Sequence, residues 1–170
     1  MAGRDSDEDE VDELLAAWGR ERPDLDAEPL GVLSRVTRLA KYLDNARRRA
    51  FLEVGLETWE FDVLAALRRA GRPYALSPGQ LASQTLVTSG TITNRVDRLE
   101  ERGLVMRERD PEDRRGIRVV LTEAGKGAVD LALEDLLGRE QAILASLSPL
   151  KRRELADLLR SLVLAFDRSP

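Results

Sequence analysis

Between residues 89 and 98, small and polar residues and Arg98 follow one another at helical spacing. Gly90, Asn94 and Arg98 are four residues apart, so a helix would place them on one face. Asparagine can pair with the edge of adenine and arginine with guanine, while serine and threonine hydroxyls serve bases or phosphates. We therefore predict that this segment contacts double-stranded DNA through the residues Ser89, Gly90, Thr91, Thr93, Asn94 and Arg98.

The opposite side of the same helix is apolar. Ile92, Val96 and Leu99 point one way, toward a core, and at about 100° per residue Arg95 lies roughly 70° from their axis. Arg95 could therefore turn inward or contact a phosphate. The alternative for the polar face is an ordinary solvated helix surface.

A second feature follows at residues 104–121, where the apolar period changes from helical to two. Two alternating stretches, 104–109 and 117–121, flank seven turn formers and charges at 110–116, which predicts a β-hairpin. Arg114 and Arg115 at its tip could reach the minor groove or phosphates, or could be a solvated turn. We expect Asp113 to brace the tip through an ion pair, because phosphate would repel a carboxylate.

These segments need helices to position them. The apolar stripe from Val11 to Trp18 predicts a short helix closed by Gly19 and Pro23, and a long helix should run from Pro29 to about Leu52. The next four helices should begin at the N-caps Thr58, Ser77, Thr88 or Ser89, and Thr122. The fourth of these helices should run to about Leu147. A final helix should begin at Ser148-Pro149.

The predicted fold is mainly α with a small β-hairpin, which together form a winged helix-turn-helix. We expect an acidic, disordered tail at 1–9, N-terminal helices of a dimerisation region at 10–56, the DNA-binding region at 57–121 and C-terminal dimerisation helices at 122–170. The terminal helices carry more apolar surface than the winged helix can cover, which favours a homodimer. A dimer would place two recognition helices about 34 Å apart, matching a palindromic operator.

Composition and charge exclude several classes of protein. The chain has no cysteine and no histidine, which excludes disulfides, Cys/His metal sites and Ser-His or Cys-His catalysis. No phosphate-binding glycine loop is present, so we expect neither an enzyme, a metal nor a cofactor. The net charge of −4 is uneven: residues 1–13 carry −6 and the rest +2. Without a basic signal peptide or a long apolar run, we expect a cytoplasmic protein that is not in a membrane.

The motifs in this order resemble the MarR family of bacterial transcriptional regulators. The matching runs are Thr88 to Glu100, Arg102-Gly103-Leu104-Val105, Asp110 to Arg115, and Leu121-Thr122-Glu123-Ala124-Gly125. The resemblance covers roughly residues 30–165. It implies a homodimeric winged-helix repressor that small ligands release from DNA.

The added N-terminal helix resembles a narrower branch of that family, which responds to urate or trans-aconitate. The resemblance implies a ligand site made by Trp18, Asp62, Arg95 and Arg107. An anionic ligand would pair with the two arginines, repel Asp62 and break an Asp62–Arg95 link, so that the recognition helix shifts. Arg22 near Trp18 favours a polycarboxylate such as trans-aconitate or citrate, whereas urate would stack on Trp18.

The sequence also allows interpretations without a ligand site, both for these residues and for the whole chain. Trp18 could be a core aromatic, Asp62 a solvated carboxylate, and Arg95 a phosphate contact. The winged-helix dimer could also serve protein–protein contacts without ligand control, which a weak salt dependence of DNA binding would reveal.

Overall fold

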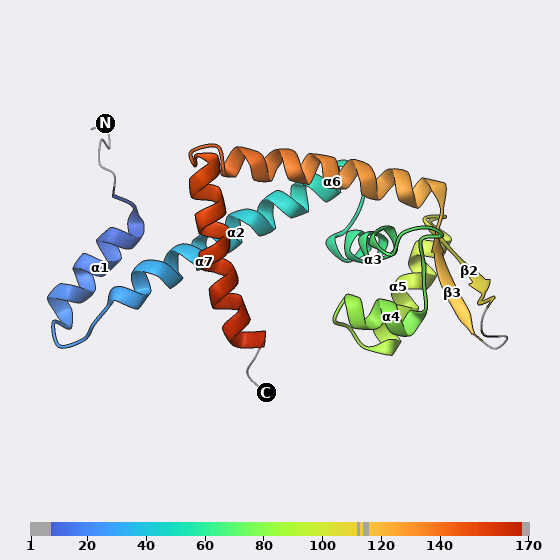
Figure 1. Ribbon diagram of the computed structural model, residues 1–170, viewed down its shortest axis with the longest axis horizontal. Coiled ribbons are helices and arrows are strands. Elements are labelled where there is room, and N and C mark those ends of the chain that lie inside the picture. The colour runs from blue at the N-terminus through green and yellow to red at the C-terminus, as the bar shows by residue number, and fades with distance from the viewer. Residues whose placement is uncertain (1–7, 112, 114–115, 168–170) are drawn as a thin grey trace. The chain divides into compact units, whose positions relative to one another are not determined.

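Figure 1 shows the computed structural model of the chain, which describes residues 8–111, 113 and 116–167. The chain divides into two compact units, one ending at Asn45 and the next beginning at Ala46, within one continuous helix. The fold is mainly helical with a small sheet, as predicted. The expected division into tail, dimerisation and DNA-binding regions stays a prediction.

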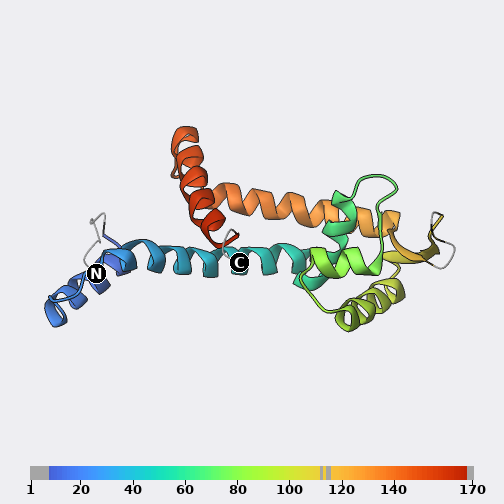
Figure 2. The same cartoon turned by 60° about the horizontal axis from the view of Figure 1, so that its bottom comes forward.

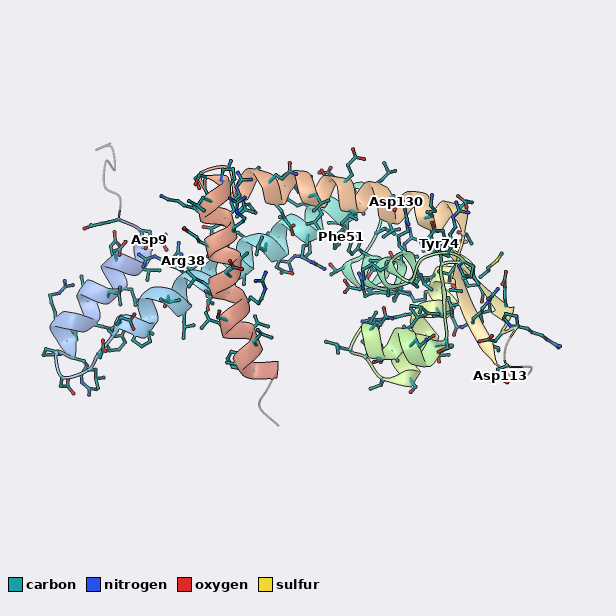
Figure 3. The ribbon with its side chains drawn as sticks, in the orientation of Figure 1. Asp9, Arg38, Phe51, Tyr74, Asp113 and Asp130 are labelled. Atoms are coloured by element: carbon teal, nitrogen blue, oxygen red, sulfur yellow. The ribbon has the colours of Figure 1, made fainter. Side chains whose placement is uncertain are left out.

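The N-terminal unit contains α1 (Glu10–Glu21) and the first part of α2 (Glu28–Glu53). Asp9 belongs to the predicted acidic tail, but in the structure it is the N-cap of α1 and accepts from the backbone N–H of Val11 at 2.8 Å. Arg35 of α2 donates to Asp9 and to Asp12, and Arg38 pairs with Glu10. Figure 3 shows Asp9 and Arg38 together at the start of α1.

The end of α1 corrects the sequence prediction. Gly19 lies inside the helix, which continues to Glu21, two residues before Pro23. Proline is the real stop, since it disfavours helical backbone at the residue before it. Residues 1–7 of the expected tail lie outside the described residues.

The C-terminal unit carries the remaining elements of the chain. These are α3 (Thr58–Arg69), β1 (Ala75–Leu76), α4 (Pro78–Gln84), α5 (Ser89–Glu101), β2 (Val105–Arg109), β3 (Ile117–Leu121), α6 (Glu123–Ile143) and α7 (Pro149–Asp167). The antiparallel sheet has the order β1-β3-β2, so the predicted hairpin gains a third strand. Figures 1 and 2 show α4 and α5 beside this sheet.

Local capping chemistry explains where most of these helices begin. Ser77 and Gln80 form a reciprocal capping box at α4, while Thr88 and Thr122 accept from the third residues of α5 and α6. Helix α3 differs from the prediction, because Glu57 and not Thr58 is its N-cap. Helix α6 ends at Ile143, four residues before the predicted Leu147.

The core of this unit lies between α3, α5, α6 and the sheet. Ile92, Val96 and Leu99 of α5 are buried, as their spacing predicted. Phe51 of α2 and Phe61 of α3 stack with ring centroids 4.0 Å apart. Figure 3 shows Tyr74 and Asp130 near the point where α3 meets α6.

Arg68 of α3 joins those two residues. Its Nε donates to Asp130 at 2.8 Å, and its guanidinium lies 5.0 Å from the centre of the Tyr74 ring. The Asp130 carboxylate raises the pKa of Arg68 above its usual value. Burial of the apolar side chains, with this ion pair at the edge, fixes α3 against α6.

Helix α7 has a different environment. None of its described side chains is buried, and Phe166 is 80% exposed. Large apolar side chains along it are open to solvent in the single chain, namely Leu150, Leu158, Leu162, Val163 and Phe166. No helix among the described residues is long and apolar enough to span a membrane.

Candidate functional site

Helix α5 presents the polar face that the sequence predicted. All of the expected DNA-contacting residues on it are exposed, namely Ser89, Gly90, Thr91, Thr93, Asn94 and Arg98. The short α4 packs against α5 across the turn at residues 85–88. This is the geometry of a helix-turn-helix, in which the second helix can enter the major groove.

Arg98 is held by two residues at the start of α3. Its Nη2 donates to Oε1 of Glu57 at 3.1 Å, and its guanidinium lies 4.7 Å from the centre of the Trp59 ring. The indole Nε1 of Trp59 donates to Oε2 of the same Glu57 at 2.7 Å. Glu57 is not among the residues that the sequence predicts for the site, because nothing along the chain relates residues 57 and 98.

A second link ties the end of α5 to the start of α3. Arg102 donates to Glu60 and, at 2.8 Å, to the carbonyl oxygen of Gly55. Glu60 is only 1% exposed, so its carboxylate needs this partner and the backbone N–H of Glu57, 2.9 Å away. These bonds fix the angle between the recognition helix and α3.

Arg107 of β2 binds the recognition helix from the wing side. It forms ion pairs with Asp97 and Glu100 of α5, and its backbone N–H also donates to Glu100 at 2.9 Å. Burial opposes the charge of Arg107, but the two carboxylates outweigh it and raise its pKa. In this structure Arg107 joins the wing to α5.

The hairpin forms where the sequence predicted it, with strands on either side of residues 110–116. Arg109 pairs with Ile117, and beyond them the N–H of Asp110 donates to the carbonyl of Gly116 at 2.9 Å. Asp113 lies near the turn of the hairpin (Figure 3). Arg114 and Arg115, the predicted tip contacts, lie outside the described residues, and the ion pair expected of Asp113 stays a prediction.

The end of α2, the start of α3 and Arg95 of α5 line a hollow of about 500 Å³, here named the α3–α5 hollow. Its lining combines charged, aromatic and aliphatic side chains, namely Arg48, Leu52, Leu56, Glu57, Thr58, Trp59, Asp62 and Arg95. Two of the four predicted ligand residues, Asp62 and Arg95, therefore share one hollow. Arg95 lies 5.6 Å from the centre of the Trp59 ring.

The expected Asp62–Arg95 link is corrected by this geometry. Asp62 pairs with Arg47 of α2, whose Nη2 is 3.3 Å from Oδ1. Both side chains of this pair are more than one-third exposed, so the ion pair contributes little to stability. Asp62 lies on the α2 side of α3, whereas Arg95 faces Trp59.

Trp18 belongs to the N-terminal unit. It lines a hollow of about 320 Å³ whose walls include Leu25, Pro29 and Leu30. Arg22, expected to add positive charge there, forms two hydrogen bonds of 2.8 and 2.7 Å with Asp24. That pair offsets the charge of Arg22 and weakens the reason for preferring a polycarboxylate over urate.

No metal-binding group of three His, Cys, Asp or Glu side chains occurs among the described residues.

A helix-turn-helix, an exposed polar recognition face and an attached β-wing together define a winged-helix DNA-binding protein. A family model described as MarR family matches residues 54–116. The chain is also 37% identical to the HTH-type transcriptional regulator PecS of Dickeya dadantii, over 88% of this chain and 90% of PecS. The chain belongs to the MarR family and is a DNA-binding transcriptional regulator.

Two solved structures are similar in fold and sequence. Sco3205 of Streptomyces coelicolor, a MarR family regulator in complex with DNA, is 25% identical with a TM-score of 0.70, covering 86% of this chain and 91% of that one. BpsR of Bordetella bronchiseptica, whose DNA binding is regulated by 6-hydroxynicotinic acid, is 27% identical with a TM-score of 0.57, covering 76% and 98%. Other relatives are named transcriptional repressors, and one is named an activatory protein. These comparisons favour DNA binding over the protein-contact alternative.

Proposed function

We propose that this regulator is a homodimeric repressor that leaves a palindromic operator when it binds a small anionic ligand such as trans-aconitate, citrate or urate. The observation that carries the proposal is the position of Arg95. It lies on the recognition helix and lines the α3–α5 hollow, and it contacts the same Trp59 ring as the DNA-facing Arg98. A ligand bound there would act directly on α5.

The DNA contacts follow from side-chain type and exposure. Asn94 and Arg98 are the base-reading candidates, and the hydroxyls of Ser89, Thr91 and Thr93 are suited to bases or phosphates. Arg114 and Arg115 complete the proposed contacts from the wing. Repression is the proposed direction of control because several relatives are named repressors.

The proposed dimer follows from unpaired apolar surface. Leu158, Leu162 and Phe166 follow helical spacing along α7 and are all exposed in the single chain. In the N-terminal unit Leu33 and Val36 of α2 are likewise exposed. A second copy of the chain would bury such surface, and a two-fold dimer would present two copies of α5 to two half-sites.

The ligand would compete for Arg95. In the structure, Arg95 contacts the face of the Trp59 ring. This cation–π contact is weaker than an ion pair with a carboxylate at short range. A ligand anion in the α3–α5 hollow would draw Arg95 away from Trp59 and would be repelled by Asp62. Because Arg95 is part of α5, the ligand-bound state would favour a different position of the recognition helix. Trp18 and Arg107 stay further candidates on the resemblance alone.

Operator affinity measured against titrated trans-aconitate, citrate and urate tests this proposal. The wild-type protein should lose DNA affinity with at least one of them, and Arg95→Ala should respond weakly or not at all. Arg49→Ala removes one exposed charge of α2 outside the hollow and is the matched control. A full ligand response in Arg95→Ala would contradict the assignment of the hollow.

A further inference from the structure

The contacts of Arg98 carry one inference beyond the DNA-binding role itself. The residue is exposed, with 51% of its side chain accessible, yet its guanidinium is held between a carboxylate and an aromatic face. An exposed arginine ordinarily samples many rotamers, and ordering it on binding costs conformational entropy. In this structure part of that ordering is present before DNA arrives.

Glu57 is the centre of the arrangement. One carboxylate oxygen, Oε1, accepts from Arg98, and the other, Oε2, accepts from the indole of Trp59. Glu57 is itself fixed, because its backbone N–H donates to the buried Glu60, which Arg102 holds. The orientation of Arg98 is therefore set by the start of α3 and not by α5 alone.

The hydrogen bond to Glu57 uses only Nη2 of Arg98. A guanidinium carries five N–H donors, so Nε and Nη1 remain able to donate to the edge of a base. The same carboxylate opposes the movement of Arg98 toward a phosphate, since the side chain would have to leave its anionic partner. Such a braced arginine is suited to a fixed base edge and poorly suited to the variable positions of phosphates.

We propose that Glu57 is a positioning residue for DNA specificity: with Trp59 it braces Arg98 so that Arg98 reads one base in each half-site and is kept from unspecific phosphate contacts. This inference rests on the proposed contact between Arg98 and DNA. It adds that the selectivity of that contact depends on a carboxylate of another helix.

The test compares Glu57→Gln with the wild-type protein on two DNA duplexes. One is the sequence that the wild-type protein selects from a random pool, and the other is a scrambled duplex of the same composition. The glutamine keeps an acceptor for Trp59 and the backbone N–H bonded to Glu60, but it loses the charge that holds Arg98. We expect affinity for the selected duplex to fall about three- to tenfold, as the ordering of one arginine is lost. Affinity for the scrambled duplex should rise, because Arg98 becomes free to contact a phosphate. The fall of log affinity with log salt concentration should then be steeper by about the amount that one phosphate contact contributes.

Two further variants separate bracing from a general charge effect. Glu101→Gln removes the same charge from an exposed position at the end of α5 and should leave the ratio of the two affinities unchanged. In the Arg98→Ala background, Glu57→Gln should no longer alter that ratio. Sequences selected by Glu57→Gln and by Arg98→Ala should lose preference at the same base pair of each half-site.

The outcomes distinguish this inference from the function on which it rests. If the wild-type protein selects no sequence from the pool, the proposed operator contact is wrong. If the wild-type protein selects a palindrome and Glu57→Gln selects it equally strongly, Glu57 does not position Arg98. A change of the affinity ratio by Glu57→Gln in the absence of Arg98 would also overturn the inference.

Discussion

A Cβ atom at Gly125 would lie 2.0 Å from the carbonyl oxygen of Leu104 and 2.9 Å from Cδ1 of Leu121. The first of these neighbours is backbone, which cannot rotate away as a side chain can. Glycine is therefore required where the first turn of α6 crosses the start of the wing. Its helix propensity is low, so close approach outweighs local preference here.

Gly125→Ala should lower the free energy of unfolding by about 3 kcal/mol, because the added methyl overlaps backbone atoms. Gly127→Ala, two residues further along α6, meets nothing within 4 Å and should raise it by about 0.5–1 kcal/mol through helix propensity. Urea denaturation of both variants measures the difference. Equal stability of the two would contradict the close contact.

The charge of Asp9 depends mainly on Arg35. Its hydrogen bonds with Arg35 lower its pKa from 3.8 to about 2. A lowered pKa means that the folded state favours the carboxylate. This stabilisation is complete above about pH 4 and is lost as the pH falls through about 2.

Arg35→Ala should raise the pKa of Asp9 toward 3.8. The pKa should stay somewhat lower than that, because the backbone N–H groups of Val11 and Asp12 still donate to Asp9. Carboxyl carbon shifts followed by NMR during an acid titration measure it. Asp24, whose pKa is lowered by Arg22, is the internal reference and should titrate as in the wild-type protein.

At the scale of elements, Arg107 is the joint between the wing and the recognition helix. It reaches from β2 to two carboxylates of α5, and the hydrogen bond from its backbone N–H adds a third connection. Its side chain is 29% exposed, so these contacts are only partly screened by water. A wing held in this way moves with α5.

Arg107→Ala should therefore loosen the hairpin even without any ligand. We expect a loss of about 1–2 kcal/mol in the free energy of unfolding, faster hydrogen exchange along β2 and weaker DNA binding. Arg69→Ala, which removes an exposed charge at the end of α3, is the control. Unchanged exchange in β2, with only the ligand response lost, would instead favour the ligand role implied by the resemblance.

At the scale of the whole molecule, the exposed apolar stripe of α7 is the surface that we expect a second copy of the chain to cover. Leu162→Glu places a charge in that stripe, whereas Ser161→Glu adds the same charge at a neighbouring polar position. We expect the first variant to sediment as a monomer and the second to remain a dimer. Operator affinity of the monomer should fall by about 100-fold or more, because two linked half-site contacts become independent. A dimeric Leu162→Glu would place the interface elsewhere.

The sequence by itself determined the order of the helices and of the two hairpin strands, and the buried side of the recognition helix. Ser77, Thr88 and Thr122 are caps that act within four residues, and the burial of Ile92, Val96 and Leu99 follows from their spacing. Such features are local, so periodicity and capping chemistry suffice to predict them. The end of α1, the N-cap of α3 and the two-residue strand β1 were predicted wrongly or missed, since neighbouring contacts decide them.

Only the tertiary structure decided which charges meet. Their spacing along the chain is equally compatible with an Arg98 that contacts only DNA and with an ion pair between Asp62 and Arg95. The fold instead brings Arg98 to Glu57 across 41 positions and Asp62 to Arg47 across 15. Long charged side chains choose partners by distance in space, and that distance is set by how α2, α3 and α5 pack around the apolar core.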